Sequence, residues 1–367
     1  DRAIEALLNS PDYADYFANK WTSLLKNQRT EAADITANFA FHAWMRDSLL
    51  ANTKYDQIVR QILASTGTIV SNPPVAWYKR VKEPTTQVED VAQLFLGVRM
   101  QCAQCHHHPF ERWTQAEYYH LAAFFSQIGR KPTAIAGEDL IFHKRGVAQT
   151  EHRKTRVMLK PAGLGEPEMD IAPDDDPRLA LVDWMSKKDN PFFAKSLVNR
   201  YWKHFFKRGL VEPEDDLRDT NPPTNPDLFE ALAKSFTDSG YDLKSLVRTI
   251  TQSHTYQLSS TPNEHNAVDR QAFSHFYPKR MSAEVLLAGR RQSIKVIRKT
   301  VTDIFSDPHE VVDTVQAKLS SAQLARRAQR VLTDAQYYNP RDLEGMLLAR
   351  LRLEYNDHQG IGLSDEE

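Results

Sequence analysis

Apolar residues recur at helical spacing through the first 70 residues of the chain. Ser10 stands directly before Pro11, which is a common start of an α-helix because serine caps the helix and proline lacks only an amide that would be unpaired there. The apolar stripe that follows consists of Tyr13, Phe17, Trp21 and Leu24. Two further stretches, "FAFHAWMRDSLLAN" and "KYDQIVRQILASTG", predict helices, the second ended by Gly67. The pattern predicts consecutive helices that share a core.

Two capping boxes are predicted in the next stretch, on either side of a short connection. Thr86 stands three residues before Glu89, and Thr114 stands three residues before Glu117. In this pattern the threonine and the glutamate each bond a backbone amide at the start of a helix. We expect a helix to begin at each box, the second one ending near Gly129.

Apolar and polar residues alternate between residues 138 and 160, with Leu140 and Phe142 in the first half of this stretch. Alternation of this kind predicts strands, and the polar residues between the two halves predict a small β-hairpin. The run "GLGEPEMDIAPDDDP" at 163–177 is rich in glycine, proline and aspartate. It predicts a linker after the hairpin.

Helical spacing returns after this linker. The segments "PRLALVDWMSK", "NPFFAKSLVNRYWKHFF", "NPDLFEALAKSFTDSG" and "DLKSLVRTITQSHTYQLSS" predict helices, and so does the region from 280 onward. The sequence therefore predicts a mainly α, multi-helix protein of two domains with a small β-hairpin insertion. The predicted ranges are a helical domain at 1–135, the hairpin insertion and linker at 136–177, a second helical domain at 178–287 and a helical tail at 288–367.

Composition agrees with a folded protein, since 41% of the residues are hydrophobic and 26% are charged. The 47 basic residues nearly balance the 48 acidic ones, so no overall charge would attract nucleic acid. No run of apolar residues is long enough to predict a membrane span. The sequence begins inside a predicted helix, without an initiator methionine or a signal peptide, so we expect a fragment or a processed chain.

Both cysteines of the chain lie in the stretch "RMQCAQCHHHPF", within the connection between the two predicted capping boxes. "CAQCH" has the CxxCH spacing of covalent c-type haem attachment. In such a site the two thiols form thioethers to the haem vinyl groups, and the next histidine reaches the iron. We therefore expect haem c on Cys102 and Cys105, with His106 as the iron ligand.

Other interpretations of this stretch remain open. Zinc is the main alternative cofactor, because Cys102, Cys105 and a nearby histidine offer three ligands, although no second pair of ligands is evident. A redox-active dithiol is usually found at a strand-to-helix junction, and two buried thiols would leave the histidines unexplained. His108 is expected to support the connection by a hydrogen bond to a backbone carbonyl or a haem propionate. The candidates for a sixth iron ligand are Met100, Met158, Met169, Met185, His143 and His152.

A longer stretch, "VAQLFLGVRMQCAQCHHHPFERWTQAEYYHLAAFF" at 91–125, resembles the planctomycete cytochrome C-like family of secreted proteins. The stretches at 190–236 and 241–260 resemble the helical companion domain of that family, and the resemblance extends from about residue 5 to Leu287. It implies an exported protein, periplasmic or secreted, with a haem-bearing region and a second domain of unknown function. The tail after Leu287 departs from the family pattern.

Two further groups of residues are candidate sites. The stretch "GLVEPEDDLRDTNPP" at 209–223 carries five carboxylates that calcium could use, but it lacks the loop pattern of a calcium site and is expected to be a solvated loop. Asn199, Arg200 and His204 could line a cleft, with Arg200 and His204 one helical turn apart, but we expect them to form the polar flank of an aromatic core helix.

Three functions follow from these features. The first is an exported haem protein that exchanges electrons with a redox partner protein, which the sequence does not identify. The second is an extracellular zinc-binding or scaffold protein. The third is an enzyme with catalytic groups in 178–287 that uses haem as an electron port.

Overall fold

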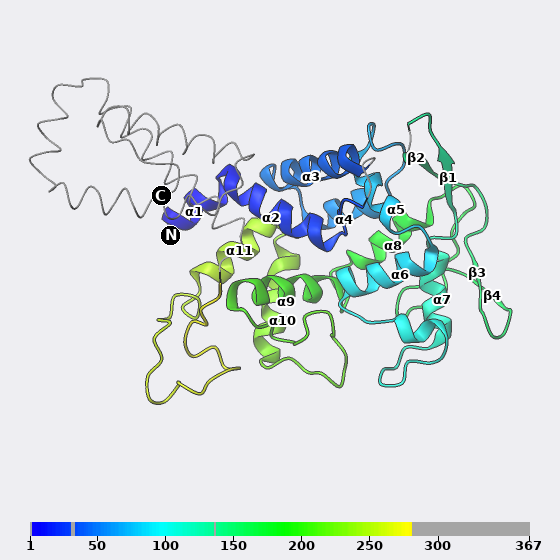
Figure 1. Cartoon of the computed structure of the whole chain (residues 1–367). Helices are drawn as coiled ribbons and strands as arrows, with labels where there is room; N and C mark the ends of the chain where they lie inside the picture. Colours follow the sequence, from blue (N-terminus) through cyan, green and yellow to red (C-terminus); the bar gives the residue numbers. More distant parts are fainter. Residues whose placement is uncertain (1, 31–33, 136, 281–367) are drawn as a thin grey trace, which may run out of the picture. The chain divides into compact units, whose positions relative to one another are not determined.

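The computed structural model describes residues 2–30, 34–135 and 137–280, and Figure 1 shows it as mostly helical. The helices of its first part are α1 (Arg2–Leu8), α2 (Pro11–Leu24), α3 (Asp34–Leu50), α4 (Tyr55–Leu63), η1 (Pro73–Val75), α5 (Ala76–Arg80), α6 (Pro84–Val91), η2 (Ala92–Leu96), η3 (Gln101–Gln104) and α7 (Gln115–Ala123). The helices of its second part are α8 (Pro177–Met185), α9 (Phe193–Phe206), α10 (Pro226–Asp238) and α11 (Leu243–Gln252). The predicted mainly α fold with a small β insertion is confirmed.

Helix α2 illustrates how the sequence pattern becomes packing. The Ser10 side chain accepts a hydrogen bond from the Tyr13 amide and caps the helix, as expected. The first three residues of the predicted stripe are buried, but Leu24 is 37% exposed. The helix ends at Leu24, but the Leu25 amide still donates to the Trp21 carbonyl at 2.9 Å, so Leu25 continues the stripe of Trp21 and is 1% exposed. The prediction for Leu24 was therefore wrong by one residue.

The two predicted capping boxes have different outcomes. Thr114 and Glu117 form a complete box at the start of α7, which confirms that prediction. The box at Thr86 is wrong, because α6 already begins at Pro84, where proline is well suited to the first turn. Glu89 instead accepts a hydrogen bond from the Tyr118 hydroxyl at 3.0 Å, which ties α6 to α7.

The β insertion consists of two separate antiparallel hairpins. Strand β1 (Ile128–Pro132) pairs with β2 (Asp139–His143), and β3 (Thr150–Glu151) pairs with β4 (Met158–Leu159). Gly129 lies in β1 opposite Phe142, so it does not end a helix; α7 stops at Ala123. Gly67 likewise does not end α4, because it forms a bridge with Ile141 of β2.

Helices from both predicted domains contribute to one hydrophobic core. Tyr55 of α4 stacks on Phe193 of α9, with ring centroids 4.9 Å apart. The Arg178 side chain of α8 is 1% exposed and donates to the Ser65 carbonyl and the Tyr78 hydroxyl, both at 3.0 Å. Helices on the two sides of the predicted linker are therefore packed against each other, and the domain boundaries themselves stay a prediction. The predicted tail at 288–367 lies outside the described residues.

Within the ranges that the structure describes, no helix combines the length and the apolar character needed to cross a bilayer.

Candidate functional site

The two cysteines lie on a tight turn between α6 and α7. The chain leaves η2, a π-helical turn, and reverses at Gly97, whose φ of +68° is easily adopted only by glycine. Cys102 lies within the 3-10 helix η3 and Cys105 directly follows it. Side chains three residues apart share one face of such a helix. Both thiols are exposed and unpaired, so the hypothesis of two buried thiols is wrong.

The backbone of this turn is anchored although its thiols are exposed. Ala103, between the cysteines, is fully buried. The next carbonyl, that of Gln104, accepts a hydrogen bond from Gln115 Nε2 at 2.9 Å and another from the Tyr119 hydroxyl at 3.1 Å. Both donors belong to α7, whose start is fixed by the capping box. We call residues 97–113 the cysteine turn. It is a surface turn whose backbone is firmly anchored to α7.

The three consecutive histidines differ in their hydrogen bonds. His106 Nδ1 lies 2.7 Å from the His107 carbonyl oxygen, which can only accept, so Nδ1 carries the proton. In the neutral ring the Nε2 atom of His106 then has a free lone pair. His107 Nδ1 accepts from the Gln115 amide and His108 Nδ1 accepts from the Phe110 amide, both at 3.3 Å. Their protons are therefore on Nε2, which makes His106 the one best prepared to ligate a metal.

His108 stabilises the connection after the cysteines. Its backbone amide donates to the Trp113 carbonyl at 2.9 Å, while its ring accepts from the Phe110 amide. Burial, and then the Arg218 guanidinium, lower the pKa of His108, with Asp216 acting in the opposite direction. The ring is therefore neutral at pH 7 and supports the loop as a hydrogen-bond acceptor at Nδ1, while the expected hydrogen bond from the ring to a backbone carbonyl or a haem propionate stays a prediction.

The candidates for a sixth iron ligand occupy different environments. Met100 and Met185 are fully buried, Met169 is half-buried, Met158 is 47% exposed, and His143 has a buried Nε2. His152 is buried in the turn between β3 and β4, where its Nδ1 accepts from the Lys154 and Thr155 amides. The same turn places Arg153 Nη1 3.6 Å from Cys105 Sγ. This hairpin turn thus directly contacts one of the two cysteine thiols.

Zinc coordination would require a further ligand close to the thiols. Among the residues that the structure describes, no group of three histidine, cysteine, aspartate or glutamate side chains converges to hold a metal ion. Covalent haem attachment makes a smaller demand, because the two thiols and the adjacent histidine are sufficient. The two exposed thiols and the His106 Nε2 atom are the types of group that covalent haem attachment uses.

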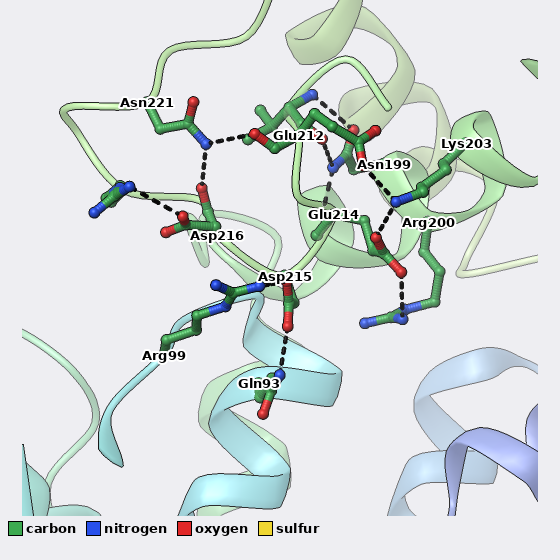
Figure 2. Close-up of polar contacts among 12 residues, drawn as sticks. Gln93, Arg99, Asn199, Arg200, Lys203, Glu212, Glu214, Asp215, Asp216 and Asn221 are labelled. Carbon is green, nitrogen blue, oxygen red and sulfur yellow. Dashed lines mark hydrogen bonds and ion pairs between the residues drawn. The ribbon is translucent and has the colours of Figure 1, made fainter. Parts of the chain in front are cut away.

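The acidic stretch at 209–223, expected to be solvated, is bound tightly to the protein; we call residues 209–221 the acidic loop. Figure 2 shows Lys203 of α9 bound to both Glu212 and Glu214. Asp215 binds Arg99 at 2.5 Å, and it also accepts from Gln93. The expectation of a solvated loop is therefore wrong. Local composition could not reveal these partners, since they lie on other elements.

Arg200 and His204 of α9 lie where the sequence placed them, at the edge of an aromatic core. Arg200 Nη1 is 3.7 Å from Glu214 Oε1 of the acidic loop. The His204 ring lies 5.4 Å from that of Phe17 and 5.6 Å from that of Tyr16. Burial, together with Lys279 and Lys20, lowers the pKa of His204 to about 3, so this ring is neutral and structural at pH 7.

Two family models match the chain, one in each part. Residues 1–130 match PSCyt2, a protein of unknown function (DUF1549), and residues 177–339 match PSD1, a protein of unknown function (DUF1553). No curated protein and no solved structure matches the chain. The two matches in this order are in line with the paired-domain planctomycete family that residues 91–125 resemble, and they identify the chain as similar to two families of proteins of unknown function.

Proposed function

We propose that the chain is an exported c-type haem protein that transfers electrons to or from a redox partner protein. The observation that supports this most strongly is the combination of two exposed, unpaired thiols on one short turn with a following histidine whose Nε2 is free. An exported location, periplasmic or secreted, follows from the family that residues 91–125 resemble.

Three residues would hold the cofactor. Cys102 and Cys105 would form the thioether bonds, and His106 Nε2 would ligate the iron. The His107 carbonyl, which accepts from His106 Nδ1, would keep the ring oriented and its proton in place, as backbone carbonyls commonly do for metal-bound histidines. When bound, haem supplies one-electron chemistry, and the chain sets its potential through ligation and burial.

The proposal is tested by expressing the chain together with haem-maturation machinery in an oxidising compartment. We expect the wild-type chain to show a Soret band that survives denaturation. The double variant Cys102→Ser with Cys105→Ser should show no such band after denaturation. His106→Ala should keep the covalent haem but change its iron spectrum, because the ligand is lost. His107→Ala is the matched control and should leave that spectrum unchanged.

Two outcomes contradict the proposal. A colourless product that contains one zinc ion per chain would support the zinc-binding alternative. Covalent haem whose spectrum responds to His107→Ala and not to His106→Ala would show that the wrong histidine has been assigned to the iron.

A further inference from the structure

The acidic loop binds the cysteine turn on its N-terminal side. The Leu217 amide donates to the Gly97 carbonyl at 2.8 Å, at the point where the chain turns toward the cysteines. Two residues later, Arg99 forms its ion pair with Asp215 (Figure 2). Burial alone would raise the pKa of Asp215, but the hydrogen bonds from Arg99 and Gln93 outweigh it and lower that pKa. The carboxylate is thus ionised and bound at neutral pH.

The same loop reaches the C-terminal side of the turn. Arg218 Nη2 is 3.2 Å from Asp216 Oδ2, and Arg218 Nε is 3.7 Å from Glu111 Oε1. The Glu111 side chain is only 8% exposed. One loop therefore contacts the segment from Gly97 to Glu111 at both ends, by a hydrogen bond and an ion pair at Gly97 and Arg99 and by a longer ion pair, without a hydrogen bond, at Glu111.

The acidic loop is itself rigidly based on α9. Asn199, which is fully buried, donates from Nδ2 to the Val211 carbonyl at 2.8 Å and accepts at Oδ1 from the Val211 amide at 3.0 Å. Lys203 binds the two glutamates that follow in the loop. A loop that is fixed at its own base can transmit that order to a segment that it contacts.

We propose that the acidic loop is a positioning element of the cysteine turn, so that the haem site is composed of residues from both matched regions. Gly97, Arg99 and Glu111 lie in the region that matches PSCyt2, and the acidic loop lies in the region that matches PSD1. The inference rests on the proposed haem function. Thioether bonds alone fix the two sulfur atoms, whereas iron ligation also requires that His106 is ordered. If the turn is ordered before haem binds, part of the entropic cost of ligation by His106 is removed.

The first test uses the full chain without haem, so it does not depend on the proposed function. In Asp215→Asn and in the double variant Glu111→Gln with Arg218→Gln, amide exchange should become at least tenfold faster at Ala103 and His108. These amides bond to Met100 and Trp113 within the turn, and neither belongs to the acidic loop. The double variant removes both charges of the Glu111 contact together, but it also removes the Arg218 partner of the buried Asp216, so its exchange is compared with that of Arg218→Gln alone.

Asp219→Asn is the matched control, because Asp219 is exposed in the same loop. Exchange at Ala103 and His108 should stay as in the wild type, and the urea midpoint shows whether a variant has lost global stability. Asp215→Glu should restore part of the protection, since it keeps the charge that binds Arg99.

The second test uses the haem-loaded chain. We expect Asp215→Asn to keep its covalent haem but to show a larger fraction of iron without the His106 ligand. Unchanged exchange in both variants would overturn the inference and leave the haem proposal intact. A chain that never takes up haem but shows the predicted exchange would overturn the haem proposal and leave the loop as a positioning element of the turn alone.

Discussion

Asn199→Leu is the sharpest perturbation of the base of the acidic loop. Leucine has the same number and branching of side-chain heavy atoms as asparagine, although its methyl groups are bulkier, and it can neither donate to the Val211 carbonyl nor accept from its amide. Asn199 is fully buried and Val211 is 2% exposed, so water cannot readily replace the lost partners. The substitution therefore leaves two buried backbone groups unpaired.

Each buried backbone group without a partner costs about 1–3 kcal/mol, so the free energy of unfolding should fall by about 2–6 kcal/mol. Urea titration followed by tryptophan fluorescence measures this loss, since the chain has six tryptophans. Asn221→Leu is the control: this half-buried amide donates to the Asp216 carbonyl at 3.0 Å and should cost about 1 kcal/mol. A loss below about 1 kcal/mol in Asn199→Leu would refute the reasoning.

Three further predictions concern stability. The pKa of His204 is about 3 in the folded chain and near 6.5 in the unfolded chain, so between these pH values only the unfolded chain binds the proton and the free energy of unfolding falls as the pH is lowered. His204→Phe should therefore lose about 2 kcal/mol less than the wild type between pH 6.5 and pH 5, as measured by urea unfolding at both pH values. Arg178→Ala should cost about 3–5 kcal/mol in the same assay, because it leaves the largely buried Asp176 without its partner. Gly97 and Gly240 share a φ of +68°, but a Cβ added at Gly97 would lie 2.8 Å from the Leu217 side chain, whereas no atom lies within 4 Å of a Cβ added at Gly240. Gly97→Ala should therefore lower the melting temperature clearly more than Gly240→Ala. Equal shifts of the melting temperature would contradict this packing.

Local sequence signals predicted the helices well where no stronger signal competed. Thr114 and Glu117 formed their capping box, whereas the same pattern at Thr86 lost to Pro84, which already starts the helix two residues earlier. Gly67 was expected to end a helix, but its left-handed backbone serves a bridge to Ile141, a partner that only the tertiary structure supplies.

The candidate site was predictable in part. The CxxCH spacing located Cys102, Cys105 and His106, because these residues are adjacent in the chain. The acidic loop was not predictable as their support: Asp215 pairs with a residue 116 positions away, and the local run of carboxylates is equally typical of a solvated loop. The proton positions on the three histidines also depend on hydrogen bonds that only the folded turn makes.

The mass of the intact, denatured chain after expression with haem-maturation machinery tests the central claim most directly. The account predicts a mass increase of one haem per chain, located by proteolysis to the peptide that contains Cys102 and Cys105. An unmodified mass, in cells where a known c-type cytochrome expressed in parallel is fully loaded, would contradict it.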